Sequence, residues 1–222
     1  MLADEVERGV PDPALQRSRM YGLLRRVFER EVDRPFLDWC SEQERAGLWS
    51  DLGLPMGRIL ESASPEDLLE ELAVEFCRLF VTSGGAGSPH ESVQMDAANP
   101  NGEPSLLMGD AVSAVKALYR KAGFALEEGA HRLPDTLSVE LEFMERLTAD
   151  EACAREAGDE DRLRCLQALQ RRMLDQHLVL WLPPYGEKLE SAARTDFYRS
   201  MLNMAVQFVK FDFAEIGGHQ GD

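Results

Sequence analysis

The spacing of apolar residues constrains the fold of this chain most, since they recur every three or four positions in almost every segment. Leu24, Val27 and Phe28, for example, fall on one face of a helix. No segment alternates apolar and polar residues as a half-buried strand does, and isoleucine occurs only at positions 59 and 216. The sequence therefore predicts an all-α protein, built as a single bundle-like helical domain.

Helix start and stop signals support this prediction. Ser64, followed by a proline and two acidic residues, offers an N-cap hydroxyl and a favourable first turn. Leu133-Pro134-Asp135 predicts the start of another helix. A long helix is expected over residues 162–182, where Pro183 and Pro184 should end it, because proline lacks the N–H group that a helix interior requires.

The amino-acid composition changes along the chain, and these changes predict where the domain, its loop and its flexible ends lie. Residues 82–105 are rich in Gly, Pro, Ser and Asn, which is typical of a long loop, and loops of this length are often functional. The sequence shows no internal repeat. We therefore expect a flexible N-terminus (1–17), one helical domain (18–214) made of an N-terminal part (18–81), the loop (82–105) and a C-terminal part (106–214), and a flexible tail (215–222).

The charge of the chain narrows the classes of partner. Forty acidic against 24 basic residues give a net charge of −16, which would repel nucleic acid. Residues 127–161 contain twelve acidic residues and three arginines, a local excess of nine negative charges. Such a cluster would attract a basic peptide in a salt-dependent way. A solvated helix face is the alternative, and we prefer it for residues 151–161.

The N-terminal residues, the apolar runs and the cysteines predict the cellular compartment of the protein. The first ten, MLADEVERGV, lack the basic start and the apolar stretch of a signal peptide. No apolar run approaches the roughly 18–20 residues that a membrane helix needs. The four cysteines include no C-x-x-C pair, so neither a zinc site nor a disulfide framework is expected. We expect a cytoplasmic protein.

Common catalytic constellations are missing from the sequence. Residues 128–131 hold the only Glu-x-x-His, and a glycine inside it makes a poor helix. Neither a phosphate-binding loop nor a nucleophile elbow occurs, and the four histidines are scattered. We therefore expect a protein that is not an enzyme and that holds no metal.

Three sequence segments indicate a protein family when their order and spacing are considered together. The first is residues 75–81 (EFCRLFV), which lead into residues 89–93 (PHESV) of the loop. The second is residues 133–144 (LPDTLSVELEFM). The third is residues 177–183 (HLVLWLP), followed by residues 196–198 (DFY). In this order and spacing they resemble the TorD/DmsD/NarJ family of redox-enzyme maturation chaperones.

The resemblance covers roughly residues 20–213. It implies a cytoplasmic chaperone that binds the twin-arginine leader, the body, or both, of the catalytic subunit of a molybdopterin oxidoreductase until its cofactor is inserted, before export. It also implies an all-α fold with a hinge near residues 131–136, as a monomer or a domain-swapped homodimer. No resident cofactor is expected, although transient contact with guanine nucleotide or molybdopterin guanine dinucleotide is allowed.

A twin-arginine leader carries two guanidinium groups followed by an apolar segment, so its receptor needs carboxylates beside an apolar groove. Several candidates have a second interpretation: Asp135 as a helix N-cap, and the aromatic and aliphatic residues as core. The predicted peptide-binding residues are Phe76, Leu79, Phe80, Ser92, Pro134, Asp135, Thr136, Glu140, Phe143, His177 and Trp181.

Two positions depart from the family pattern, and three alternative functions stay open. Thr136 stands where the family commonly has histidine, and Gln94 where it commonly has an aromatic residue. The alternatives are a NarJ-type chaperone of a subunit that is not exported, an accessory protein that handles guanine nucleotide or cofactor, and an acidic helical scaffold.

Overall fold

The computed structural model describes residues 12–82, 87–96, 110–126 and 132–218. These residues form helices and turns, with one isolated antiparallel bridge between His90 and Thr136, so the all-α prediction is confirmed. The helices are α1 (Pro13–Glu29), α2 (Arg34–Arg45), α3 (Leu48–Asp51), α4 (Met56–Leu60), α5 (Pro65–Phe76), α6 (Glu91–Asp96), α7 (Asp110–Ala122), α8 (Leu137–Ala157), α9 (Glu160–Met173), α10 (Val179–Ala192) and α11 (Asp196–Gly218), with π-helical turns η1 (Cys77–Val81) and η2 (Leu174–Leu178).

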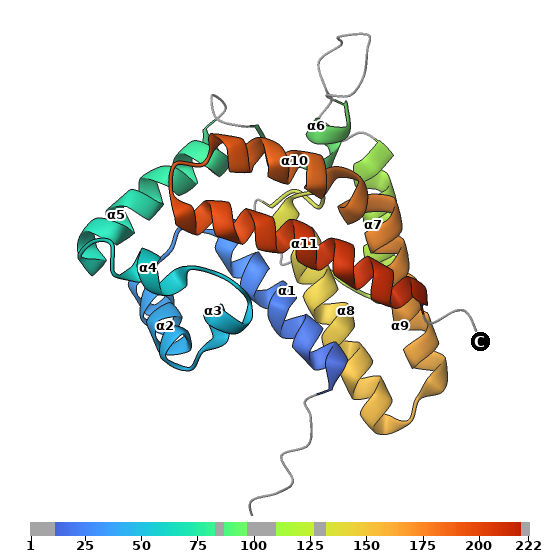
Figure 1. Cartoon of the computed structure of the whole chain (residues 1–222). Coiled ribbons are helices and arrows are strands. Elements are labelled where there is room, and N and C mark those ends of the chain that lie inside the picture. The colour runs from blue at the N-terminus through green and yellow to red at the C-terminus, as the bar shows by residue number, and fades with distance from the viewer. Residues whose placement is uncertain (1–11, 83–86, 97–109, 127–131, 219–222) are drawn as a thin grey trace, which may run out of the picture.

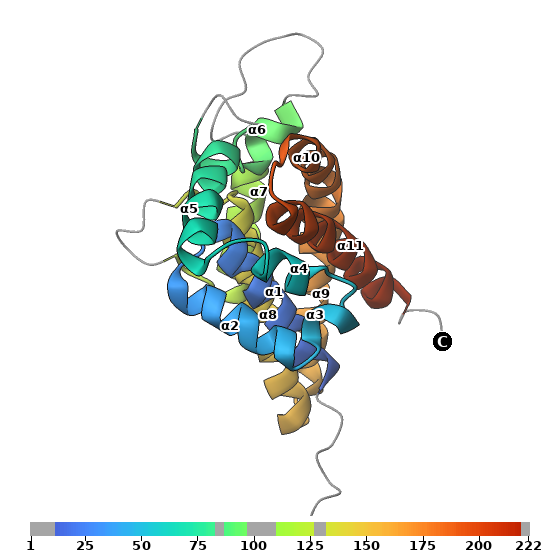
Figure 2. The same ribbon diagram turned by 60° about the vertical axis from the view of Figure 1, so that its left-hand side comes forward.

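Helices α1 and α8 pack along each other, and α9 packs on α8 (Figures 1 and 2). Helices α10 and α11 run next to each other, while α2 to α5 gather on one side and α6 and α7 on the other (Figure 1). One buried apolar cluster includes Leu72 of α5, Phe143 of α8 and Leu202 of α11. The parts before and after residues 82–105 therefore share a hydrophobic core.

Local capping chemistry sets several helix ends. The Ser64 hydroxyl accepts a hydrogen bond from the Asp67 N–H, as the sequence predicted. Asp12 caps α1 by accepting from the Ala14 N–H, so this helix begins at Pro13 and not near residue 18. Helix α11 continues to Gly218, which is also beyond the expected end of the domain at residue 214.

The predicted loop over residues 82–105 is partly wrong, because α6 lies inside it. Residues 83–86 and 97–105 fall outside the described residues. Helix α6 is one and a half turns long and would be marginal alone, since so short a helix makes few internal hydrogen bonds. Contacts with distant residues, described below, account for a helix that local sequence does not predict.

The predicted helix end at Pro183 and Pro184 is wrong as well. The chain stays helical through both prolines to Ala192. The turn η2 precedes them, and the axis changes direction between α9 and α10 (Figure 1). A π turn widens the helix and a bend relieves the clash of a proline ring with the preceding turn, which together allow the prolines inside it.

A helix that spans a membrane must be both long and apolar. Within the four described stretches, none of the helices is both long and apolar enough to span a bilayer.

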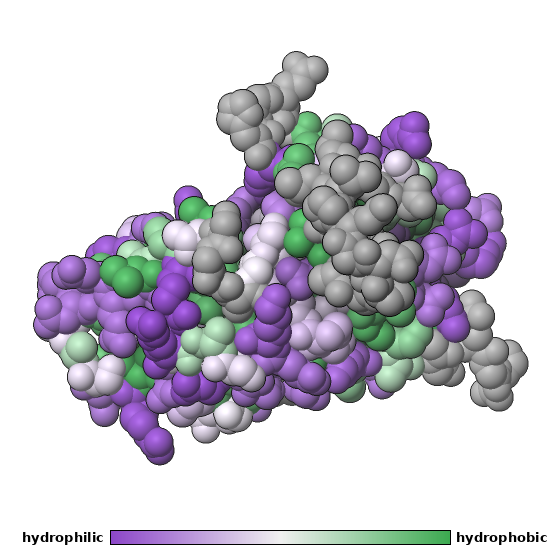
Figure 3. Space-filling model, turned by 90° about the horizontal axis from the view of Figure 1, so that it is seen from above, coloured by the Kyte–Doolittle hydropathy of each residue, from purple (hydrophilic) through white to green (hydrophobic). Residues whose placement is uncertain are grey.

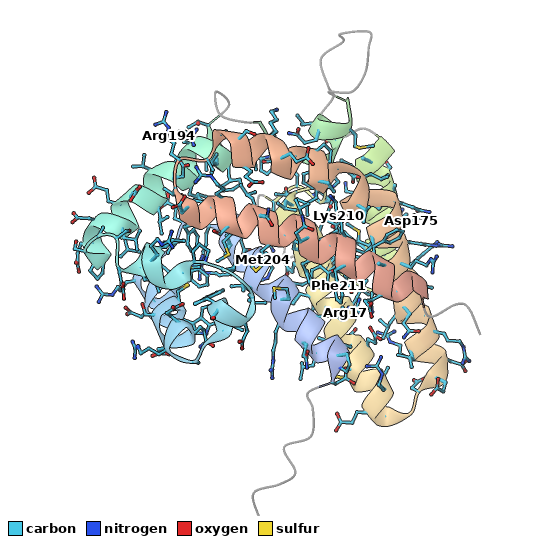
Figure 4. The ribbon with its side chains drawn as sticks, viewed as in Figure 1. Arg17, Asp175, Arg194, Met204, Lys210 and Phe211 are labelled. Carbon is cyan, nitrogen blue, oxygen red and sulfur yellow. The ribbon has the colours of Figure 1, made fainter. Side chains whose placement is uncertain are left out.

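A buried polar network joins four helices near Arg17 of α1 (Figure 4). Its guanidinium contacts Glu151 of α8 at 3.0 Å, Gln170 of α9 at 2.6 Å, and Asp212 of α11. The Tyr21 hydroxyl donates to the same Asp212 carboxylate at 2.5 Å. Glu151 is 3% exposed, so its assignment to a solvated helix face is wrong. The network fixes how α1 crosses the C-terminal helices.

Replacing Glu151 with Gln tests this network. Burial alone would raise the pKa of the Glu151 carboxyl, but hydrogen bonds from Gln170 and Gln167 and the charges of Arg17 and Arg155 lower it below 4.5. A lowered pKa means stability that is present above pH 4.5 and lost as the pH falls through the folded pKa. We expect Glu151→Gln to lower the free energy of unfolding by about 1 kcal/mol or more at pH 7. The deficit should shrink by pH 3 in urea titrations.

The matched control for this prediction is Glu156→Gln, an exposed position on the same helix. It should change the free energy of unfolding by less than about 0.5 kcal/mol at either pH. An equal deficit for Glu151→Gln at pH 7 and pH 3 would contradict the charge-based account and leave only a packing effect.

Close packing of α10 on α11 gives a second prediction. A Cβ atom at Gly186 would lie 2.5 Å from Cγ2 of the buried Val206. We expect Gly186→Ala to lower the free energy of unfolding by about 1–3 kcal/mol, because the two helices must separate slightly. At Gly22 an added Cβ would meet only the flexible carboxylate end of Glu145. Gly22→Ala should therefore stay within about 1 kcal/mol of wild type. Thermal unfolding of both variants checks the contrast, and similar losses would contradict it.

Candidate functional site

The apolar candidates from the sequence lie in the core. Phe76 and Phe80 pack with ring centroids 5.2 Å apart, and Leu79 between them is fully buried. Phe143 packs against Tyr119 with tilted rings, whose centroids lie 4.7 Å apart, and it is also fully buried. Their packing matches the core interpretation that the sequence left open. Any peptide contact with these side chains requires part of the structure to move.

The polar candidates converge on one place, where residues 87–96 meet the start of α8. The Glu91 N–H donates to the Asp135 carbonyl at 2.9 Å, and the Leu137 N–H donates to the Pro89 carbonyl at 2.9 Å. The Tyr119 hydroxyl donates to the Pro134 carbonyl at 2.8 Å and holds this turn against α7. Two segments that are far apart in the sequence thus form a short antiparallel contact.

Asp135 is the centre of this contact, and it is 1% exposed. Its Oδ2 accepts from the Ser92 N–H at 3.1 Å and from the Ser92 hydroxyl at 2.6 Å. Its Oδ1 has no hydrogen-bond partner among the described residues, and His90 Nδ1 lies 3.8 Å from it. The N-cap interpretation of Asp135 is wrong, because Thr136 is the N-cap residue of α8. The carboxylate instead holds α6.

Glu91 and His177 form the second contact. The His177 Nδ1 lies 2.9 Å from both carboxylate oxygens of Glu91, and each side chain is 3% exposed. Sequence reasoning selected His177 and missed Glu91, although Glu91 belongs to the segment PHESV. The only local signal is an acidic residue in a loop, and its partner is 86 residues away.

Glu140 of α8 is the third buried carboxyl group of the cluster. The Trp181 indole N–H donates to its Oε2 at 3.0 Å. Burial raises the pKa of Glu140 well above its usual range, and the neighbouring charges of Glu91 and Asp135 add to this effect, whereas the Trp181 hydrogen bond opposes it. Among the described residues Oε1 has no hydrogen-bond partner. The Glu140 carboxyl group therefore keeps its proton to a higher pH than an exposed glutamate does.

We call Glu91, Asp135, Glu140, His177 and Trp181 the polar cluster. Its three carboxyl groups have separate partners: Glu91 contacts the His177 imidazole, Glu140 accepts from the Trp181 indole N–H, and Asp135 accepts from Ser92. Among the described residues no three His, Cys, Asp or Glu side chains are arranged to hold a metal ion. The Oδ1 atom of Asp135 is the acceptor that stays open to an additional hydrogen-bond donor.

The residues at the two departures from the family pattern make local contacts. Thr136 is half-buried; its hydroxyl donates to the Leu133 carbonyl at 2.8 Å and lies 3.1 Å from His90 Nδ1. The Gln94 amide donates to the Ser88 carbonyl at 2.7 Å. Both side chains support the fold of the segments that meet at Asp135.

The acidic excess over residues 127–161 is largely paired. Glu142 contacts Arg132 at 2.8 Å, and Glu145 contacts Arg25 of α1 at 2.7 Å. Glu151 and Glu140 are buried, as described above, while Glu127 and Glu128 lie outside the described residues. The local field is therefore weaker than the count of charges predicted, because basic side chains from other helices fold onto it.

Surface hollows lie away from the polar cluster. One of about 400 Å³ is lined by Glu70, Val74 and Arg194, and another of about 460 Å³ is lined by Val74 and Cys77, among others. Neither includes a residue of the polar cluster. Seen from above, the surface is a mosaic of hydrophilic residues and small hydrophobic patches (Figure 3). The polar cluster is thus interior, with no residue in either hollow.

Replacing Glu140 with Gln tests the protonation of the polar cluster. A raised carboxyl pKa means stability that is full below pH 4.5 and lost as the pH rises through the folded pKa. Gln keeps an acceptor for the Trp181 N–H and has no charge to bury. We expect Glu140→Gln to gain stability over wild type as the pH rises from 4.5 to 8, as measured by urea unfolding.

Glu140→Ala provides the contrasting variant. It leaves the buried Trp181 N–H without an acceptor, which costs about 1–3 kcal/mol, and it opens a cavity. We expect lower stability than wild type at both ends of the pH range. A Gln variant that is destabilised more at pH 8 than at pH 4.5 would show that Glu140 is ionised in the folded protein.

The sequence of this chain is similar to the sequences of several known chaperones. The chain is 29% identical to the perchlorate reductase assembly chaperone protein of Dechloromonas aromatica, over 97% of this chain and 96% of the relative. It is 26% identical to the chaperone protein TorD of Shewanella oneidensis, over 88% of each chain, and 27% identical to TorD of Photobacterium profundum, over 70% of this chain and 68% of the relative.

The family model described as nitrate reductase delta subunit matches residues 46–185, which is more than half of the chain and includes every member of the polar cluster. The chain therefore belongs to the nitrate reductase delta subunit family, which confirms its resemblance to TorD, DmsD and NarJ.

Proposed function

We propose that this protein is a cytoplasmic assembly chaperone, and not an enzyme, for the catalytic subunit of a molybdopterin oxidoreductase. It binds the twin-arginine leader of that subunit before export. The similarity to an assembly chaperone of perchlorate reductase over nearly the whole length of both chains supports the assignment, as does the similarity to several TorD chaperones.

The open carboxylate oxygen of Asp135 is the observation that carries leader recognition. A guanidinium presents several N–H donors in a planar fork, and its hydrogen bonds to a carboxylate are about twice as strong as neutral ones. One oxygen of Asp135 is held by Ser92, and the other has no hydrogen-bond partner within the described stretches. The raised pKa of Glu140 disfavours a further negative charge beside it. One arginine of the leader would bind at Asp135.

A second candidate function is recognition of the folded body of a subunit that is not exported. The burial of the predicted peptide-binding residues favours it, because Phe76, Phe143 and Trp181 offer no surface to a peptide in this conformation. A folded client would contact the exposed surface instead, where Val74 is 64% exposed between two hollows.

Fluorescence anisotropy of a labelled twin-arginine leader tests the proposal. We expect saturable binding that prefers arginine to lysine at the paired positions and weakens between about 50 and 200 mM salt. Asp135→Asn should weaken binding about tenfold or more, because the charge-assisted bond is lost.

The matched control is Asp175→Asn, an exposed aspartate on the same helical turn as His177 (Figure 4). It should bind the leader within about twofold of wild type, since an exposed charge contributes little. Equal affinity of the Asp135 variant and wild type would refute the assigned site. Absence of binding by every leader would favour the folded-body function.

A further inference from the structure

The segment of residues 87–96 is attached to the protein differently from every long helix. Its described side chains contribute nothing to the buried apolar core, and none of its apolar residues packs against that core. Among its described side chains Glu91 and Ser92 are the buried ones, and Met95 is 41% exposed. The segment is therefore held by polar contacts.

Those contacts lie on the residues that we propose for leader recognition. Ser92 binds Asp135, Glu91 binds His177, and the backbone of the segment bridges to Thr136. At the other end the Tyr185 hydroxyl of α10 donates to the Gly87 carbonyl at 3.3 Å. Helix α6 thus lies next to α10 and α7 (Figure 1), and its first two residues contact His177 and Asp135.

The balance of energies makes this attachment reversible. Burial of apolar side chains holds a segment most firmly, and no described side chain of residues 87–96 is part of the apolar core. The net stabilisation from one hydrogen bond is small, and the desolvation of a buried charge offsets much of its attraction to a partner. Segments with few buried apolar contacts open locally at a small fraction of the global unfolding free energy. Residues 87–96 fit this description.

We propose that residues 87–96 are an autoinhibitory cover over Asp135 and His177, and that the leader displaces them to bind. This inference rests on the proposed function. On opening, Asp135 loses the Ser92 donors and gains the guanidinium of the leader, while Glu91 leaves the His177 imidazole. Ser92, which the sequence placed among the peptide-binding residues, becomes a latch.

The direction in which two substitutions change the affinity for the leader tests the cover. Ser92→Ala removes the hydroxyl that binds Asp135, and Glu91→Gln removes the charge that faces His177, while both leave the polar residues of α8 and η2 unchanged. If Ser92 contacts the leader, its loss weakens binding. If Ser92 is a latch, its loss strengthens binding, because the apparent affinity rises with the fraction of open protein.

Hydrogen exchange of full-length protein provides an independent measure of opening. The Ser92 and Leu137 amides are donors between the segment and the start of α8. We expect Ser92→Ala and Glu91→Gln to accelerate exchange at both positions about tenfold, and to strengthen leader binding by the same factor. The matched control is Met95→Ala, whose exposed side chain is on the same helix, and it should change neither quantity by more than about twofold.

The outcomes separate the cover from the proposed function. Faster exchange with stronger leader binding supports both. Faster exchange with unchanged or weaker leader binding overturns the cover and leaves leader recognition intact. Unchanged exchange in both variants overturns the latch contacts. Absence of leader binding by wild type and by the opened variants overturns the leader-binding function, and the cover with it.

Discussion

The buried pair of Glu91 and His177 is the contact on which the arrangement of the candidate site depends. It joins residues 86 positions apart and brings α6 onto the junction of α9 and α10. A carboxylate without this imidazole would be buried without compensation, at a cost of several kcal/mol. With the pair in place, Ser92 reaches Asp135 and the backbone of the segment pairs with the start of α8. The Trp181–Glu140 hydrogen bond is a separate contact, which joins α10 to α8.

The raised pKa of Glu140 limits the number of negative charges in the polar cluster. The polar cluster holds three carboxyl groups, and two full negative charges beside each other would repel strongly there. Burial and the neighbouring charge of Glu91 raise the pKa of Glu140, which disfavours another negative charge beside Trp181. Asp135 keeps one carboxylate oxygen without a hydrogen-bond partner in the part of the chain that the structure describes. In the proposed function, this oxygen binds the client and the weakly held segment controls access to it.

Local signals predicted a large part of the fold. The cap at Ser64 and the apolar spacing of α1 and α8 act within a few residues, so the sequence contains all the information they need. Predictions failed where a distant residue decides the outcome. Asp135 serves α6 and not its own helix, the prolines at 183 and 184 are allowed by the bend after η2, and the acids at 142 and 145 meet arginines. Each of these features depends on a residue or a bend outside its own segment, so the local sequence pattern does not predict it.

The sequence by itself determined that the protein is all-α, that it has little capacity for sheets, and that it resembles redox-enzyme maturation chaperones through three ordered segments. It also selected Asp135, Glu140, His177 and Trp181 as candidates. Only the tertiary structure decided that they are buried, that Glu91 joins them, and that Ser92 and Glu91 contact Asp135 and His177. The physical reason is that helix formation depends on neighbours along the chain, whereas burial and pairing of charges depend on which helices meet.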